Sequence, residues 1–399
     1  MHSARYATWT LLLSFFGLAC AGYLTFLHLG LLRGELLGGP VCGTGVFNCH
    51  AVTAGAWGMW LGMPVALWGM FGYVAVFALS LLAVQSTEWA GHAFTLLVTL
   101  STLFVAADLF LLVVMAAVIR FYCLFCLLTY GINGLLLLIS VRASRCSWID
   151  SLRRTPSALR WLWPSAERRA AALVWGILLV GGLGVAGVHV ATTFVTRGTV
   201  GGLQQQIRDY VSKQPHDTIE ISGDPVIGSP QAPIQVVEFS DFFCPACQRA
   251  SKLNVVILAN HRRNMALYFK HYPLDTTCND KISRMVHPGA CTVAAASECV
   301  HQQGRFWAFH DLVFEQGHAY ALSNLDEDVK RLGVDWPRFH ACMESGKGME
   351  AVKQDIAEGN RRGVTSTPTY VVNGVSIAGG LTPTTFDDLV AALRQTENR

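Results

Sequence analysis

The sequence predicts a two-part fold, in which an all-α bundle of membrane-spanning helices precedes an α/β domain. Of the 399 residues, 52% are hydrophobic and only 14% are charged, and the mean hydropathy of +0.37 is too high for a protein that is soluble throughout. Long apolar runs fill the first half of the chain. Residues 197–399 are polar and alternate strand-length apolar runs with helical patterns.

Five apolar runs are long enough to cross a bilayer core, which takes roughly 20 residues. They occupy residues 9–32, 57–84, 93–119, 121–141 and 171–195. We interpret the first run as a retained anchor, because the residues that follow it offer no small-x-small cleavage site.

The orientation follows from the segment between the fourth and fifth runs. Residues 142–169 contain seven arginines but only two acidic residues, a bias that marks cytoplasmic loops. The amino terminus is then cytoplasmic, and the loop after the first run and the carboxy-terminal domain lie outside. We expect a four-span domain at 1–145, a cytoplasmic basic loop, fifth span and linker at 146–200, and the external domain at 201–399.

Charge and cysteine content narrow the possible partners. The net charge is +3, and no basic cluster is interleaved with aromatic residues, so we expect a lipid bilayer as partner and no nucleic acid. Twelve cysteines, several in close pairs, indicate an oxidising compartment.

The external domain contains a CxxC motif in a strand-then-helix context. Residues 236–239 are a strand pattern, Cys244-Pro245-Ala246-Cys247 follows, and a helical pattern continues from Gln248. A helix N-terminus stabilises a thiolate, so Cys244 is the expected nucleophile and Cys247 the resolving thiol. A zinc site is the alternative, but no second pair with ligand spacing occurs in this domain, so we predict no metal.

The segments EFSDFFCPACQ and TSTPTYVVNG, with a helical stretch between them, resemble the DsbA-like branch of the thioredoxin superfamily. The resemblance implies a thioredoxin fold with a helical insertion. It also implies that Thr367-Pro368 is a cis peptide facing the CxxC motif and that Glu238 is a buried carboxylate serving proton transfer at Cys247.

Four further cysteines lie in this domain. Cys278 and Cys291 bracket a loop, and in an exported domain we expect them to form a structural disulfide. Cys299 and Cys342 either pair or remain buried thiols, and the sequence leaves both open.

The membrane part has two cysteine pairs that the predicted topology places on the outer side. Cys42 and Cys49 lie on a glycine-containing loop, which suits a mobile shuttle, and Cys123 and Cys126 lie at the outer end of the fourth span. A cysteine that only serves as a small apolar side chain in a helix, such as Cys20, needs no second cysteine close to it. Ordered pairs on one side are what thiol–disulfide exchange requires, so we expect a relay.

Three segments, CGTGVFNC, AWGMWLGMPVALWGMFGY and FYCLFCLLTYGIN, resemble the vitamin K epoxide reductase family across residues 9–141. The resemblance implies that Cys123 and Cys126 face a quinone, ubiquinone or menaquinone, with Cys126 next to its ring. It implies that Cys42 and Cys49 are the shuttle, that Tyr130 lines the quinone pocket, and that Trp57 lies on a short helix covering it.

Fusion to a thioredoxin-like domain resembles bacterial members of this family, which implies a multi-pass protein of the bacterial inner membrane with a periplasmic domain. The predicted function is oxidative: reduced exported proteins pass electrons through the three cysteine pairs to a membrane quinone. A reductase or isomerase, and a non-enzymatic client-binding protein, are the alternatives. Asp108, deep in the third span, has either a proton-transfer or a packing role.

Overall fold

The structure is a computed structural model that describes residues 2–32, 43–44, 47–61, 63–85, 87–162 and 169–397. Its contacts divide the chain into two compact units, Met1–Gly201 and Gly202–Arg399. We describe each unit by itself.

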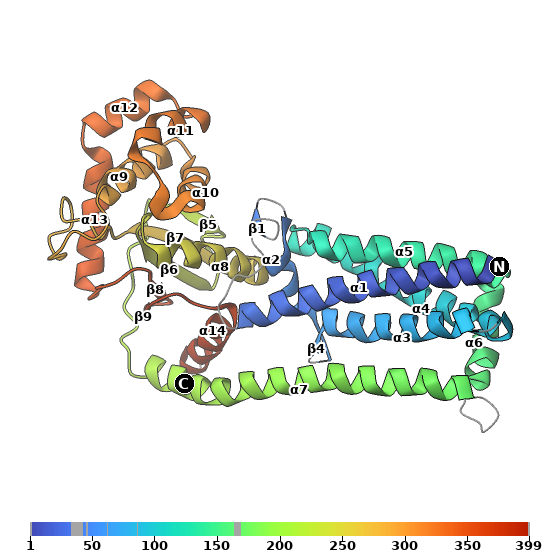
Figure 1. Cartoon of the computed structure of the whole chain (residues 1–399). Helices are drawn as coiled ribbons and strands as arrows, with labels where there is room; N and C mark the ends of the chain where they lie inside the picture. Colours follow the sequence, from blue (N-terminus) through green and yellow to red (C-terminus); the bar gives the residue numbers. More distant parts are fainter. Residues whose placement is uncertain are drawn as a thin grey trace. The chain divides into compact units, whose positions relative to one another are not determined.

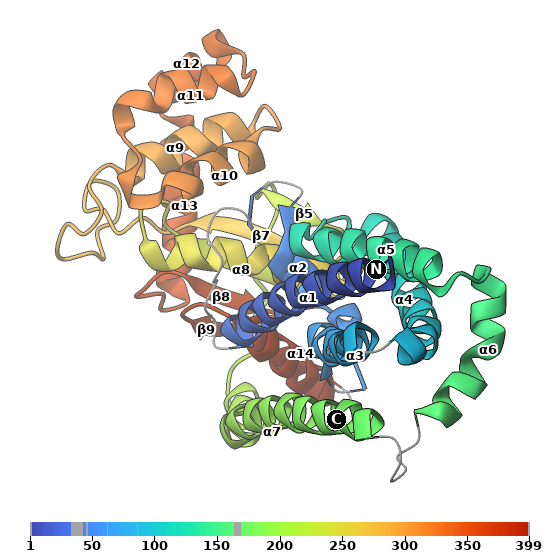
Figure 2. The same ribbon diagram turned by 45° about the vertical axis from the view of Figure 1, so that its right-hand side comes forward.

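The first unit is built on four long helices that lie side by side (Figures 1 and 2). They are α1 (His2–Leu32), α3 (Val65–Gln85), α4 (Thr87–Val114, continued by a π-helical turn, Met115–Ile119) and α5 (Leu124–Ser144). Within the described residues, four segments are long and apolar enough to cross a membrane, and each lies on one of these helices. The predicted helical bundle is therefore confirmed.

Close helix packing and outward apolar side chains fit this bundle to a bilayer. A Cβ atom at Gly17 of α1 would collide with the ring of Tyr73 on α3, so the small residue is what allows the two helices to approach. Exposed apolar side chains, including Phe15, Leu103 and Leu109, offer the outward surface that a hydrocarbon solvent favours.

Short elements connect α1 to α3. They are β1 (Gly43–Thr44), β2 (Phe47–Asn48), α2 (Cys49–Thr53), a 3-10 turn (Ala56–Gly58), β3 (Met59–Trp60) and β4 (Met63–Pro64). The second apolar run was expected to be helical from residue 57, but the helix begins only at Val65. Leu61 has a positive φ of 50° in the turn between β3 and β4, and Pro64 lacks the N–H that would extend the helix backwards.

The last part of the unit holds α6 (Trp148–Trp161) and most of α7 (Arg169–Val211), whose last turns belong to the second unit. Helix α6 lies in the arginine-rich segment and packs on α4, where the Trp148 indole donates to the Thr102 hydroxyl at 2.9 Å. The glycine-containing segment 198–202 was expected to be a linker, yet α7 continues through it. Extending an existing helix is much less costly than starting one, so these glycines do not end it.

The second unit is a five-stranded mixed sheet flanked by helices. In spatial order the strands are β5 (Val226–Gly228), β7 (Met265–His271), β6 (Ile234–Ser240), β8 (Thr369–Val372) and β9 (Val375–Ala378). Only β6 and β7 are parallel, and the connection between them is α8 (Pro245–His261). Helix α14 (Pro383–Glu397) packs against α8.

A helical insertion separates β7 from β8, as the resemblance to DsbA-like proteins implied (Figure 1). It comprises α9 (Ala290–His301), α10 (Phe306–Gln316), α11 (Leu325–Arg331), α12 (Trp336–Glu344) and α13 (Lys347–Arg361), with two 3-10 turns, Gly317–Ala319 and Leu322–Asn324. A disulfide between Cys299 and Cys342 joins α9 to α12, which resolves the pairing that the sequence left open.

Removing this disulfide by the double substitution Cys299→Ala and Cys342→Ala should lower the free energy of unfolding of the second unit by about 2–4 kcal/mol, because the bond closes a long loop in the unfolded chain. The change is measured by denaturant titration of the detergent-solubilised chain, with proteolysis of the helical insertion as the readout of unfolding. Cys146→Ala, which removes a free thiol, should leave the midpoint unchanged. An unchanged midpoint in the double variant would contradict the expectation.

Candidate functional site

The CxxC motif stands where strand β6 turns into helix α8. Cys244 is the N-cap residue of α8, and Pro245 occupies the first helical position, where its missing N–H costs nothing. Cys247 lies one turn further and is fully buried. The local sequence therefore places one sulfur at the helix N-terminus and the other behind it.

The two thiols are held in opposite protonation states. A hydrogen bond with Cys247, assisted by Thr367 and by the amides of Ala246 and Cys247, lowers the pKa of Cys244 to about 5. Burial raises the pKa of Cys247 well above its usual value, and the neighbouring Cys244 raises it further. At neutral pH, Cys244 is a thiolate and Cys247 a thiol.

The Thr367-Pro368 peptide is cis and faces this motif, because the Cys244 sulfur lies 3.4 Å from the Thr367 carbonyl oxygen. The next strand, β8, pairs with β6 and carries Tyr370 directly opposite Glu238. The two loops that meet at the cysteines therefore leave neighbouring strands of one sheet.

Glu238 is a buried carboxyl group beneath the cysteines. Burial raises its pKa to about 7, and its negative charge contributes to the raised pKa of Cys247. The Asn254 side chain donates to Glu238 Oε2 at 2.6 Å and accepts from the Tyr370 hydroxyl at 2.9 Å. The carboxyl group can thus gain or lose a proton near neutral pH, and Asn254 and Tyr370 are partners that the sequence did not reveal.

In the membrane unit, Cys123 and Cys126 form a disulfide at the start of α5. Cys123 is the N-cap residue, and its sulfur accepts a hydrogen bond from the Cys126 amide at 3.2 Å. Cys123, like Cys244, therefore lies at the positive end of a helix dipole.

A short backbone bridge brings the segment before α2 to this pair. The Asn48 amide donates to the Tyr122 carbonyl at 2.9 Å, and Phe47 pairs with Tyr122. Cys49 and Cys123, the residues that follow Asn48 and Tyr122, are both fully buried in one apolar cluster. Cys49 is disulfide-bonded, whereas Cys42 lies outside the described residues.

Two other residues were predicted around this pair, Tyr130 and Trp57. Tyr130 is one turn beyond Cys126 and packs against the same cluster, which also includes Met115. Trp57 lies on the 3-10 turn and contacts Phe110 edge-on, with ring centroids 5.7 Å apart. The structure therefore gathers Cys49, Cys123, Cys126 and Tyr130, and places Trp57 beside Phe110.

Asp108 has a partner that the sequence did not reveal. The Asn133 side chain donates to Asp108 Oδ2 at 2.9 Å and accepts from the Tyr73 hydroxyl at 2.8 Å. Asn133 is seven residues beyond Cys126, on the same face of α5. Hydrogen bonding compensates for a polar group at this depth.

One cluster of metal-binding side-chain types occurs among the described residues, formed by His271, Glu298 and Asp355. Its groups already pair with protein partners: His271 Nε2 lies 3.0 Å from Glu298, and Lys270 Nζ lies 2.9 Å from Asp355. A cation bound there would have to displace Lys270.

The thiolate of Cys244 yields a testable pH dependence. In the reduced wild type, the alkylation rate of Cys244 should rise with pH through a midpoint near 5. Cys247→Ala removes the hydrogen bond that contributes most to the thiolate, so the midpoint should move up, towards the ordinary thiol value of roughly 8.5. Mass spectrometry of the Cys244 peptide gives the rates. Equal midpoints in the two proteins would argue against the assigned hydrogen bond, and Cys146→Ala is the control.

Comparison with known proteins gives partial matches to Na(+)/H(+) antiporters and to solved structures of thioredoxin-like proteins. The Na(+)/H(+) antiporter NhaA 3 of Salinispora tropica is 32% identical over 151 residues, which are 38% of this chain and 22% of the antiporter. The Na(+)/H(+) antiporter NhaA of Herminiimonas arsenicoxydans is 29% identical over 172 residues, 43% of this chain and 26% of the antiporter. The chain thus matches only about a quarter of the length of these relatives.

Among solved structures, a thioredoxin-like oxidoreductase from Silicibacter pomeroyi is 23% identical, with a TM-score of 0.37, and the match covers 44% of this chain and 94% of that one. BdbD from Bacillus subtilis is 23% identical, with a TM-score of 0.36 and the same two coverages. The thiol-disulfide exchange protein alpha-DsbA2 from Wolbachia pipientis is 15% identical, with a TM-score of 0.38, covering 48% of this chain and 97% of that one.

Two family matches divide the chain in the same way as its fold. Residues 8–141 match the Vitamin K epoxide reductase family, and residues 220–392 match Thioredoxin. The first match contains the four bundle helices and the second contains the CxxC motif and the cis-proline loop. The chain therefore carries a region that matches the Vitamin K epoxide reductase family, with four helices long and apolar enough to cross a membrane, followed by a thioredoxin-like domain.

Proposed function

We propose that this protein is a membrane thiol–disulfide oxidoreductase that works as a thiol oxidase, which makes disulfides in exported proteins and passes the electrons to a membrane quinone. Electrons run from the client to Cys244 and Cys247, then to Cys42 and Cys49, and then to Cys123 and Cys126. The observation that carries the proposal is the pairing of Asn48 with Tyr122, which buries Cys49 in one cluster with Cys123.

The electrostatics of the soluble site support this direction. A thiolate that is stable at neutral pH is a good leaving group, and stabilising the reduced form makes the corresponding disulfide a strong oxidant. Cys244, with a pKa of about 5, has this property.

At this site the exchange needs no other reactant. A client thiolate attacks the Cys244 sulfur of the oxidised pair, and the Cys244–Cys247 bond breaks with its electron pair on Cys247. Cys247 takes up a proton, which Glu238 would supply: its pKa is about 7, and its charge acts on Cys247. A second client thiolate attacks the client sulfur of the mixed disulfide and releases the Cys244 thiolate.

The relay in the membrane unit then follows the same chemistry. A shuttle thiolate attacks Cys123, the Cys123–Cys126 bond breaks, and Cys126 leaves as a thiolate at the helix N-terminus. Resolution of the mixed disulfide returns the shuttle pair to its oxidised state. Each client disulfide thereby delivers two electrons and two protons to Cys123 and Cys126.

The apolar cluster around this pair fits a quinone. Cys126, Phe125 and Tyr130 pack there as partly buried side chains, so they offer one sulfur, one aromatic face and one hydroxyl donor. A bound quinone would supply the two-electron acceptor that regenerates the disulfide. Cys126 would face it and Tyr130 would hold it by a hydrogen bond, with Trp57 on the covering 3-10 turn.

The proposal requires the thioredoxin-like domain to lie outside the cytoplasm. A reporter phosphatase that folds only outside should be active when fused after Arg399 and inactive when fused after Arg154, because the arginine-rich segment stays inside. Enzyme assays on whole cells, with protein level as the control, measure this. Activity at Arg154 alone would reverse the proposed orientation.

The relay makes a separate prediction for Cys126→Ala. The variant should stop client oxidation and leave Cys244 and Cys247 reduced, because a lone Cys123 thiol offers the shuttle no disulfide bond to attack. Non-reducing gels after alkylation, with soluble quinone and dithiol supplied, report both results. Cys20→Ala should behave as wild type, and quinone reduction by Cys126→Ala at the wild-type rate would refute the relay.

Tyr130→Phe isolates the quinone contact from the thiol chemistry. Losing one hydrogen bond of about 0.5–1.5 kcal/mol should raise the quinone concentration needed for half-maximal turnover by roughly twofold to tenfold. Exchange among the cysteines should be unaffected. An unchanged quinone requirement would remove Tyr130 from the pocket while leaving the relay intact.

A further inference from the structure

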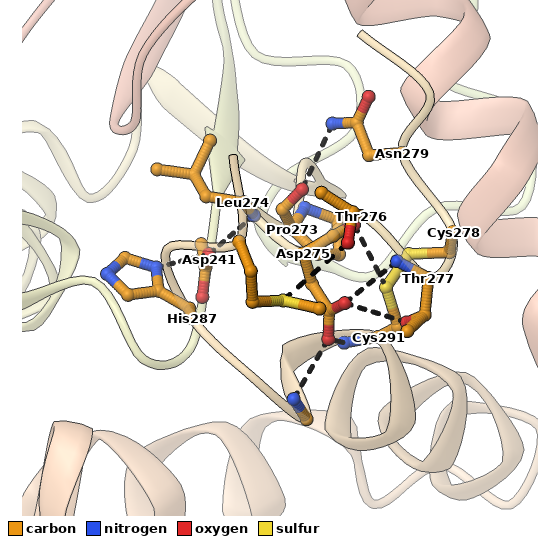
Figure 3. The surroundings of a disulfide bond; sticks show 12 residues. Asp241, Pro273, Leu274, Asp275, Thr276, Thr277, Cys278, Asn279, His287 and Cys291 are labelled. Atoms are coloured by element: carbon orange, nitrogen blue, oxygen red, sulfur yellow. Dashed lines mark hydrogen bonds and ion pairs between the residues drawn. A yellow bond between two sulfur atoms is a disulfide. The ribbon is translucent and has the colours of Figure 1, made fainter. Parts of the chain in front are cut away.

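The loop between β7 and α9 is fastened beside the CxxC turn. The disulfide between Cys278 and Cys291 joins the interior of this loop to the first turn of α9. Asp275 accepts hydrogen bonds from the amides of Thr277 and Gly289, both at 2.9 Å, and from the Cys291 amide at 3.4 Å (Figure 3). The loop therefore has a fixed course, and the residues it carries are held in place.

This loop presents His287 to the residue that begins the CxxC turn. His287 Nδ1 lies 2.7 Å from Asp241 Oδ2, which also accepts from the Leu274 amide at 2.7 Å (Figure 3). The other oxygen of Asp241 accepts from the Phe243 amide at 2.8 Å, and the Asp241 carbonyl accepts from the Cys244 amide at 3.0 Å. His287 is thus joined through one buried carboxylate to the backbone of the nucleophile.

The surroundings favour a charged imidazole. The hydrogen bond to Asp241 is the largest cause of the raised pKa of His287, and the negative charge of Cys244 contributes in the same direction. The imidazole side chain is 15% exposed and the Asp241 side chain is completely buried, so the pair is only partly screened by water.

Interactions between charges are reciprocal: a thiolate that favours the imidazolium is itself favoured by the imidazolium. The hydrogen bonds from Leu274 and Phe243 already fix the Asp241 carboxylate, so His287 is not required to position it. A positive charge beside Cys244 is what His287 adds.

We propose that His287 is a positioning residue for thiol exchange, an imidazolium anchored on Asp241 that stabilises the Cys244 thiolate. The Cys278–Cys291 disulfide holds the loop from which it acts. The proposal rests on the proposed function only in taking Cys244 as the exchanging thiol, and it is independent of the quinone and of the direction of electron flow.

Four other titratable groups lie near the CxxC turn in the described part of the chain and come from β6, the turn itself, α8 and the helical insertion. They are Glu238, Asp241, Cys247 and Tyr320, and none of these four is a cation. His287 itself faces Asp241 and Cys244.

The experiment measures the alkylation rate of Cys244 against pH in the reduced, full-length, detergent-solubilised chain. His287→Gln keeps a hydrogen-bond donor for Asp241 but removes the charge, and should raise the midpoint by about 0.5–1 pH unit. Alkylation at pH 5 should then slow by roughly twofold to sixfold, as the thiolate fraction falls. His287→Arg keeps a cation and should restore most of the wild-type rate.

His340→Gln is the matched control, because His340 also pairs with a carboxylate, Glu344 at 3.3 Å, but on α12 of the insertion. It should leave the midpoint unchanged. Raising the salt concentration should raise the wild-type midpoint and have less effect on His287→Gln, a comparison that does not require the Arg variant to fold.

A wild-type midpoint in His287→Gln would overturn the proposal. If the midpoint were raised in His287→Arg at the same time, His287 would be a structural hydrogen-bond donor only. Failure of the oxidase function would appear differently. The midpoints would shift as expected, while quinone-dependent oxidation of Cys244 and Cys247 would be missing.

Discussion

The stabilisation of one sulfur as a thiolate at a helix N-terminus is the interaction on which the chemistry of the soluble unit depends. Cys244 caps α8 and has a lowered pKa, whereas burial keeps Cys247 protonated one turn later. The sheet supplies the rest of the site, because β6 carries Glu238 beneath the pair and the loop before β8 brings Thr367 against the nucleophile. The free energy of the thiolate therefore depends on residues distributed over the whole domain.

In the membrane unit, apolar side chains surround the cysteines instead. A single backbone pairing, between Asn48 and Tyr122, holds the segment before α2 against the segment before α5. Burial of Cys49 and Cys123 then follows from the packing of α1 and α4 around them. Thiol exchange requires sulfurs to meet in line, and a buried cluster limits the directions from which they can approach.

The sequence predicted the parts of the structure that depend on local pattern. The strand before Cys244, the helix after it and the bundle helices follow from apolar periodicity and length. Local pattern did not predict that the second bundle helix starts only after Pro64, or that α7 continues through Gly198–Gly202, because tertiary packing decides helix ends. Local pattern also did not predict contacts between residues far apart in the sequence. The Cys299–Cys342 disulfide and the Asp241–His287 hydrogen bond both depend on how the chain folds back on itself.

The second unit carries two disulfides of its own besides the CxxC pair, Cys278–Cys291 and Cys299–Cys342. During biogenesis, a newly made copy is itself a substrate for disulfide formation, and it must acquire both bonds before its insertion is fully stable. If mature copies supply them, the amount of active protein sustains its own production. Cells emptied of the mature form would then recover slowly, with a lag set by whichever other oxidant completes the first molecules.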